Sequence, residues 1–140
     1  MIQAATAEAV RRLLKQCQLP TADLSESHLE HFFARRNGDA LEGVVGLELY
    51  PPYALLRSLA VAPSERGRGI GRQLVMEAER HAREHGAREI YLLTTTAERF
   101  FARAGYESVP RNDAPSAIRE TSEFATICPA SAALMRKRLA

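Results

Sequence analysis

The residues whose spacing most clearly points to chemistry are three alternating glycines in segment 66–71, which reads RGRGIG. Glycine lets the backbone take conformations closed to other residues and approach a ligand closely. The segment joins an apolar run to an amphipathic pattern, so its N–H groups combine with those of a helix start into a concave anion site. Arg66, Arg68 and Arg72 add positive charge, which favours a phosphate or pyrophosphate. The alternative is an ordinary tight turn with solvated arginines.

The spacing of these residues excludes two common nucleotide-binding loops. A P-loop needs Lys-Ser or Lys-Thr after its last glycine, whereas Gly71 is followed by Arg72 and Gln73. A dinucleotide fingerprint needs glycines at positions one, three and six, and the sixth position from Gly67 is Arg72. The predicted phosphate therefore belongs to another class of ligand.

Arg57 is a second candidate, because it is a charged residue inside an otherwise apolar strand. Its face of the strand is expected to carry three apolar residues, Leu55, Leu59 and Val61. A charge in that position is costly unless it is paired. Arg57 therefore either pairs with a carboxylate such as Glu48 or reaches into a cavity to hold the anion of a substrate.

A general base is harder to find from residue type alone. Glu48 and His31 are candidates, although both also suit a paired or surface role. Thr94 and its two threonine neighbours can orient a substrate or a water molecule, but Thr95 also suits a helix cap. Two further arginines are weaker candidates for holding a substrate anion, Arg35 and Arg111.

Periodicity and turn signals predict the elements that position these residues. Alternation and bounding turn residues predict strands over 1–5, 28–35, 41–50, 53–61, 89–94 and 132–139. Helical spacing predicts helices that begin after Thr6 and Asp113 and that cover 71–85 and 97–104. Thr95 and Glu98 fit a capping box, and Asp113 is the expected cap of the last helix.

The order of these elements predicts how the strands pair. Strands 28–35, 41–50 and 53–61 are joined by short turns, which favours an antiparallel meander. A helix connects strand 53–61 to strand 89–94, so these two are expected to be parallel neighbours.

Composition limits the class of protein. A chain of 140 residues is expected to form one domain, 1–140, and 46% hydrophobic with 26% charged residues is ordinary for a soluble globular protein. A formal net charge of +2 does not argue for nucleic acid, and no apolar run is long enough for a membrane span. Cys17 and Cys128 lie far apart without a CxxC motif, which favours neither a disulfide framework nor a metal site and fits a reducing cytoplasm.

Two motifs carry a family resemblance. The pattern RxxGxG at 66–71, directly after a strand that ends LAVAP at 59–63, resembles the acyl-CoA pyrophosphate loop of the GCN5-related N-acetyltransferases (GNAT). The segment FFARAGY at 100–106 is similar to the helix of that family and its exit. The resemblance implies a single GNAT-like α/β (α+β) domain, with a mixed sheet of six to seven strands and helices on both faces. It also implies a splay between the strands that end near Val61 and Thr94.

The same resemblance implies acetyl-CoA as the donor, lying in this splay. The cofactor-binding residues that it implies are Leu59, Ala60, Val61, Arg66, Gly67, Arg68, Gly69, Ile70, Gly71, Arg72, Phe100 and Phe101. A backbone N–H near Val61 would polarise the thioester carbonyl, and an amine would attack it directly in a ternary complex. Glu48 and Thr94 are the predicted catalytic residues, and Arg57 with Glu48 the predicted acceptor contacts.

Phe101 departs from the family pattern. Many members place there a tyrosine that can protonate the departing CoA thiolate, and a phenyl ring has no proton to give. Water, Tyr106 or no specific residue would then fill that role, because a thiolate is a fair leaving group near neutral pH. Phe101 can still pack beside the thiol end of CoA.

Segments 19–24, 56–61, 91–96 and 124–131 resemble small acetyltransferases associated with arsenic-resistance operons, which implies detoxification. The favoured function is N-acetylation of a small amine, such as an amino-acid-like toxin. The alternatives are a non-catalytic acyl-CoA-binding regulatory module and a thiol-based arsenic binder that joins Cys17 and Cys128. The expected partners are a small-molecule amine and a second copy that shares the final strand, with no nucleic acid and no membrane.

Overall fold

The computed structural model describes residues 2–4, 7–17, 31–37, 40–121, 124–125 and 132–139. Its strands are β1 (Ile2–Ala4), β2 (Phe32–Asn37), β3 (Ala40–Tyr50), β4 (Tyr53–Val61), β5 (Glu89–Thr94), β6 (Glu107–Val109) and β7 (Ala133–Arg138). Its helices are α1 (Ala7–Gln16), α3 (Ile70–Glu84), α4 (Glu98–Arg103) and α5 (Ser116–Arg119), with short 3-10 turns η1 (Pro63–Glu65) and η2 (Arg111–Asp113).

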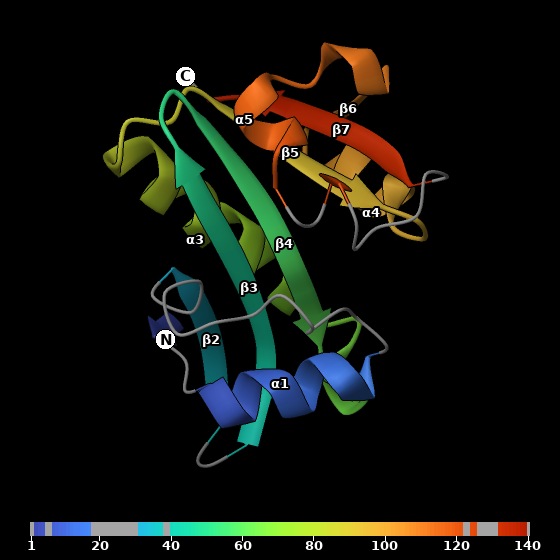
Figure 1. The fold of residues 1–140 in the computed structure, drawn as a ribbon. Coiled ribbons are helices and arrows are strands. Elements are labelled where there is room, and N and C mark those ends of the chain that lie inside the picture. Colours follow the sequence, from blue (N-terminus) through green and yellow to red (C-terminus); the bar gives the residue numbers. More distant parts are fainter. Residues whose placement is uncertain are drawn as a thin grey trace.

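One mixed sheet organises the described part of the chain, with seven strands in the order β1-β2-β3-β4-β5-β7-β6. Strands β1 to β4 form antiparallel pairs, β4 and β5 are parallel, and β7 lies antiparallel between β5 and β6. This arrangement confirms the predicted meander, the parallel crossover and the mixed sheet. The final strand is inserted into the sheet of its own chain, beside β5 (Figure 1).

Helices cover both faces of the sheet, as predicted (Figure 1). On one face, α1 buries Val10 and Leu14 against Phe32 of β2, and α5 buries Ile118 in a second cluster. On the other face, the largest core cluster joins α3 and α4 to the sheet, and its α3 members are Ile70, Leu74, Val75, Ala78 and Ala82. The helix predicted over 71–85 therefore exists, and its apolar side chains form the surface that packs on the sheet.

A bulge interrupts the pairing of β3 with β4. Val44 lies opposite Ala60 and Gly46 lies opposite Arg57, so one β3 residue faces two β4 residues, Ser58 and Leu59. An extra residue shifts the alternation of side chains beyond it. Leu59 and Val61 consequently pack against the core on the α3 face, so the prediction that they share a face with Arg57 is wrong.

The bulge coincides with the place where β4 and β5 separate. The parallel ladder pairs Tyr53 with Glu89, Ala54 with Ile90 and Leu55 with Tyr91, and within the described residues it extends no further. The remainder of β4, up to Val61, diverges from β5 (Figure 1). This divergence confirms the predicted splay between the strands that end at Val61 and Thr94.

Three local predictions are wrong. The second strand, Phe32–Asn37, ends two residues beyond the predicted end at 35, because Arg36 and Asn37 still pair with β3; the predicted start, 28–30, lies outside the described residues. Asp113 does not cap α5, since it belongs to η2 and α5 starts after Pro115. The capping box at Thr95 is also absent, because Thr94 Oγ1 accepts the N–H of Ala97 at 3.0 Å in its place.

None of the described helices is long and apolar enough to cross a bilayer.

Candidate active site

A cavity of about 550 Å³ lies where β4 and β5 diverge and α3 begins. Its lining combines the end of β4, the glycine-rich loop and the entry of α4. The lining residues are Cys17, Leu59, Ala60, Val61, Glu65, Arg66, Gly67, Gly69, Ile70, Gly71, Arg72, Thr96, Ala97 and Phe100. Most of the residues predicted to bind a cofactor are thus brought to one surface. Glu65 and Ala97 were not predicted, while Thr96 was predicted only to orient a substrate or a water and Cys17 only as a thiol ligand; the fold brings all four to the cavity.

The glycines of the loop form the polar wall of this cavity. Gly67 and Gly69 have φ values of +85° and +79°, in the left-handed region that side chains disfavour. Gly69 is also the N-terminal cap position of α3, so the first unpaired N–H groups of that helix open at the cavity. A Cβ at either glycine would meet no protein atom within 4 Å, so the space beside them is open to a ligand.

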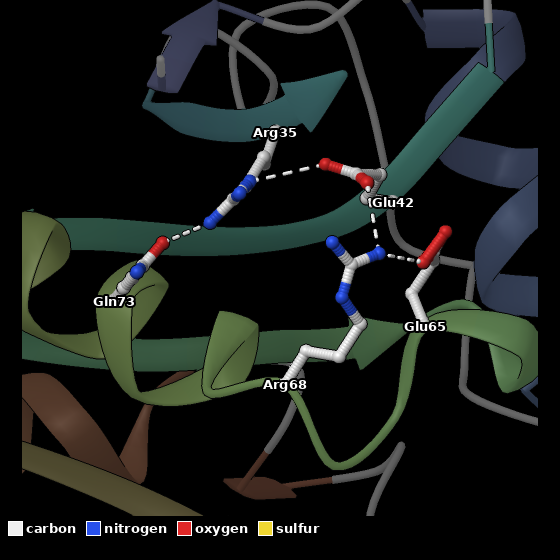
Figure 2. A network of polar contacts seen from close by, with 5 residues as sticks. All are labelled: Arg35, Glu42, Glu65, Arg68 and Gln73. Atoms are coloured by element: carbon white, nitrogen blue, oxygen red, sulfur yellow. Dashed lines mark hydrogen bonds and ion pairs between the residues drawn. The ribbon is translucent and has the colours of Figure 1, made fainter. Parts of the chain in front are cut away.

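The arginines of the loop divide into two groups. Arg66 and Arg72 line the cavity, and both are exposed. Arg68 turns away, with its NH1 2.7 Å from Glu65 Oε2 and 3.9 Å from Glu42 Oε2 (Figure 2). The cavity can therefore offer an anion two guanidinium groups as well as backbone amides.

Glu42 is the centre of a network that ties the loop to the sheet (Figure 2). Its buried carboxylate accepts a 3.0 Å bond from Arg35 Nε, and Arg35 also donates to Gln73 of α3. The network joins β2, β3, the loop and the first turn of α3. Arg35, a weaker candidate for a substrate anion, is thus engaged in holding the loop in place.

The end of β4 presents main-chain groups to the cavity. Ala62 N donates to Glu42 O at 2.8 Å, which makes the adjacent pair Gly43–Val61 a non-hydrogen-bonded pair of the antiparallel ladder. The N–H and C=O of Val61 therefore point away from β3, into the splay. Arg66 Nε reaches Val61 O at 3.2 Å. An extended ligand with amide groups can pair with this edge as an added strand would.

Arg57 and Glu48 form a buried ion pair beside the bulge. Arg57 NH1 lies 2.7 Å from Glu48 Oε2, and the side chains are 0% and 6% exposed. Tyr50 OH donates to the other oxygen of Glu48, and Arg57 Nε donates to Ser58 Oγ at 3.2 Å. Of the two roles expected for Arg57, the structure shows the pairing with Glu48. A role toward a substrate anion stays a prediction, as does a base role for Glu48.

Thr94 ends β5 on the far side of the splay. Its Oγ1 accepts the N–H groups of Thr96 and Ala97 at 3.4 and 3.0 Å, so it shapes the entry of α4. This contact fixes Ala97 and the helix that carries Phe100 against the cavity. A direct catalytic role for Thr94 stays a prediction.

Phe101 and Tyr106 lie in the core next to the cavity wall. Phe101 is 4% exposed and packs edge-on against Phe100 and Tyr106. Tyr106 OH donates to Glu79 Oε2 at 3.0 Å, and burial followed by the Glu79 charge raises the pKa of Tyr106 far above its usual range. Neither side chain is among the described residues that line the cavity. Such a tyrosine is a poor proton donor to a ligand.

His31, a candidate base, belongs to a histidine cluster away from the cavity. Its Nδ1 lies 3.2 Å from His81 Nε2, and the rings of His81 and His85 are 4.1 Å apart. Phe33 packs edge-on against His81. The described position of His31 therefore does not support a base role at the cavity.

This cluster leads to a prediction about stability and pH. Burial, then His85 and His31, lower the pKa of His81 below its ordinary value of 6.5, against the opposing charges of Glu84 and Glu77. Below pH 6.5 the unfolded chain then binds more protons than the folded one. We expect the unfolding midpoint to fall as the pH drops from above 6.5 toward 5, measured by thermal denaturation. His81→Gln should flatten this slope; an unchanged slope would contradict the assignment.

Arg111 and the two cysteines were also candidates for binding a ligand. Arg111 donates to the carbonyls of Ala132 and Phe124 and stacks on the Phe124 ring, so it holds the C-terminal segment. Cys17 Sγ lies 3.7 Å from both Val61 O and Arg66 NH2, whereas Cys128 lies outside the described residues. Across the described ranges, no three His, Cys, Asp or Glu side chains are grouped so as to hold a metal ion.

Comparison with known proteins agrees with this geometry. The described residues place a glycine-rich loop at the start of a helix, beside the diverging parallel strands of a mixed sheet. Residues 3–107 match the model of the acetyltransferase (GNAT) family. The chain belongs to that family.

Individual relatives give the same result. An uncharacterized N-acetyltransferase of Chlorobaculum tepidum is 35% identical over 92 residues, which cover 65% of this chain and 59% of the relative. The amino-acid acetyltransferase of Ralstonia nicotianae is 28% identical over 99 residues, or 69% of this chain and 22% of the relative. The chain thus spans well under two thirds of both relatives.

A solved structure shares the fold. N-acetylglutamate synthase from Neisseria gonorrhoeae, complexed with coenzyme A and N-acetyl-glutamate, superposes with a TM-score of 0.86 at 18% identity. The superposition covers 100% of this chain and 35% of that chain.

Proposed function

We propose that this chain transfers the acetyl group of acetyl-CoA to the amine of a small, amino-acid-like acceptor. The observation that carries the proposal is the cavity in the β4–β5 splay, with the glycine loop and the start of α3 at one end. It offers amides and two arginines to a pyrophosphate, and it offers pantetheine the edge of β4 that points away from β3, where Arg66 contacts the Val61 carbonyl. The names of the Ralstonia and Neisseria relatives support an amino acid as the acceptor class.

The proposed reaction is a direct transfer in a ternary complex. The neutral amine forms a bond to the acetyl carbon, the carbon–sulfur bond breaks, and CoA leaves as the thiolate. The N–H of Val61 points into the splay and would stabilise the negative charge that develops on the carbonyl oxygen. Holding the two reactants together supplies much of the rate.

Proton transfer in this scheme falls to few groups. Glu48 is the proposed base, directly or through a water, and Thr94 is proposed to orient the acceptor. Because Phe101 has no proton and Tyr106 is bound to Glu79, the CoA thiolate is proposed to take its proton from solvent. Arg57, paired with Glu48, is proposed to attract the acceptor carboxylate to the same place.

Calorimetry with acetyl-CoA, followed by thiol-release assays on a panel of amines and amino acids, tests the proposal. We expect acetyl-CoA to bind and at least one amino acid to release free thiol. Binding without turnover on any acceptor would contradict the enzyme and favour a non-catalytic acyl-CoA-binding module. Absence of acetyl-CoA binding would overturn the whole assignment.

The base assignment gives a separate prediction. Glu48→Gln keeps the shape, and its amide oxygen can still accept the bond from Arg57, while its NH2 can only donate, to the Tyr50 hydroxyl; the change removes the group that accepts the amine proton. We expect kcat to fall by about a hundredfold while the Kd for acetyl-CoA changes little. Glu84→Gln, an exposed change on α3, is the matched control and should leave both unchanged. A Glu48→Gln enzyme with normal kcat would remove Glu48 from the mechanism.

Two finer expectations rest on the sequence resemblance. A detoxification role linked to arsenic resistance would follow if the acceptor is an amino-acid-like toxin, and the acceptor panel should include such compounds. A reducing cytoplasm fits the thiol of Cys17 at the cavity.

A further inference from the structure

Ser58 has a backbone conformation that its side chain disfavours. Its φ is +58°, and among the described residues other than glycine it is the one with a positive φ. A residue with a Cβ is held in the left-handed region only when its surroundings impose that conformation. The residues around Ser58 must therefore hold its backbone in this left-handed conformation.

The contacts that hold Ser58 come from a buried chain of side chains on β3 and β4. Arg57 Nε donates to Ser58 Oγ at 3.2 Å, and Arg57 NH1 is fixed 2.7 Å from Glu48 Oε2. Glu48 in turn accepts the hydroxyl of Tyr50. Arg57 and Glu48 are 3% and 6% exposed, so the bond between them is shielded from water, whereas the bonds to Ser58 and Tyr50 are partly buried.

Because of its position in β4, the conformation of Ser58 affects the segment that lines the cavity. Ser58 is the first of the two β4 residues in the bulge, directly before Leu59–Val61, the segment that lines the cavity. The bulge puts the side chains of Leu59 and Val61 on the α3 face and turns the N–H and C=O of Val61 into the splay. A strand without the extra residue would have the opposite alternation of side chains.

We propose that Ser58 is a positioning residue for acyl-CoA, held in its left-handed conformation by Arg57 and thereby setting which groups of Leu59–Val61 face the donor. This proposal rests on the proposed function for the identity of the ligand. Ser58 acts through the main chain of the segment that follows it, without itself carrying out a chemical step.

Two substitutions at Ser58 separate its backbone role from a role of its hydroxyl. Ser58→Gly removes the contact with Arg57 but adopts a positive φ freely, so the Kd for CoA should stay within about threefold of wild type. Ser58→Ala removes the same contact and keeps the Cβ, so the Kd should rise by about fivefold or more. Isothermal titration calorimetry with CoA alone measures both values. Equal Kd values for the two variants would overturn the proposal.

A second comparison tests the part played by Arg57. Arg57→Lys keeps a positive charge for Glu48 but lacks the Nε that holds Ser58, so the Kd for CoA should rise. In the double variant Arg57→Lys with Ser58→Gly, the Kd should return to that of Ser58→Gly alone, because glycine needs no clamp. If the effects of the two substitutions on the Kd were additive, Arg57 would not act by holding Ser58. The Ser58 pair decides the matter by itself if Arg57→Lys does not fold, as judged by thermal denaturation.

The outcome for wild type separates this inference from the proposed function. If wild type fails to bind CoA, the proposed function fails. If wild type binds CoA and the variants bind equally well, only the role of Ser58 is refuted.

Discussion

Gly69→Asp should raise the Kd for acetyl-CoA at least about a hundredfold, because it places a carboxylate where the pyrophosphate is proposed to lie. Gly69 caps α3 with a φ of +79°, and no protein atom lies within 4 Å of the Cβ that a side chain would add. Aspartate tolerates the left-handed region better than most residues, so the fold should survive. Calorimetry with acetyl-CoA measures the loss, and thermal denaturation checks the fold.

Gly69→Asn is the matched control for this substitution. It has the same shape and the same tolerance for positive φ, but no charge. We expect its Kd to lie between those of wild type and Gly69→Asp, since it keeps the bulk and removes the repulsion. Unchanged affinity in Gly69→Asp would show that the pyrophosphate lies elsewhere. Equal losses in both variants would assign the effect to bulk alone.

Gly46→Ala should lower the free energy of unfolding by about 3 kcal/mol, because it overpacks the core beneath α1. A Cβ on Gly46 would lie 2.3 to 2.7 Å from atoms of the Phe32 ring, which is fully buried between the sheet and α1. The ring cannot move away without displacing its neighbours Val10 and Leu14. Urea denaturation followed by circular dichroism measures the change.

The double variant Gly46→Ala with Phe32→Leu tests the cause of this loss. Phe32→Leu alone should destabilise the protein by leaving a cavity. Combined with Gly46→Ala it should cost less than the sum of the single changes by at least about 1 kcal/mol, since the smaller side chain makes room for the methyl group. Strict additivity would show that Gly46→Ala acts by some route other than contact with Phe32.

Local patterns in the sequence were enough to predict the glycine-rich loop and the strands and helix on either side of it. The alternating glycines of 66–71 predict a loop that needs positive φ, and the structure gives Gly67 and Gly69 that conformation. The periodicity of residues 71–85 predicts the buried stripe of α3, and the connection of strand 53–61 to strand 89–94 through a helix predicts a parallel pair. These properties depend on neighbours in the chain, so a single sequence contains them.

Local patterns were insufficient where more than one residue could serve as the cap of a helix. Thr95 has the sequence of a helix cap, yet it is Thr94, the last residue of β5, that accepts the N–H of Ala97 at the start of α4. Asp113 likewise has the residue type of a cap but lies in a 3-10 turn. Residue type allows several caps, and the path of the chain selects one.

The sequence by itself determined the family, the glycine-rich loop and the pattern of strands and helices, because each follows from spacing along the chain. Only the tertiary structure decided which face of the sheet the β4 side chains after Arg57 point to, and which residues surround Arg57. The bulge at Ser58 arises from pairing with β3, and the pairing of Arg57 with Glu48 depends on the same register. Register is a relation between two strands, and the composition of either strand alone does not specify it.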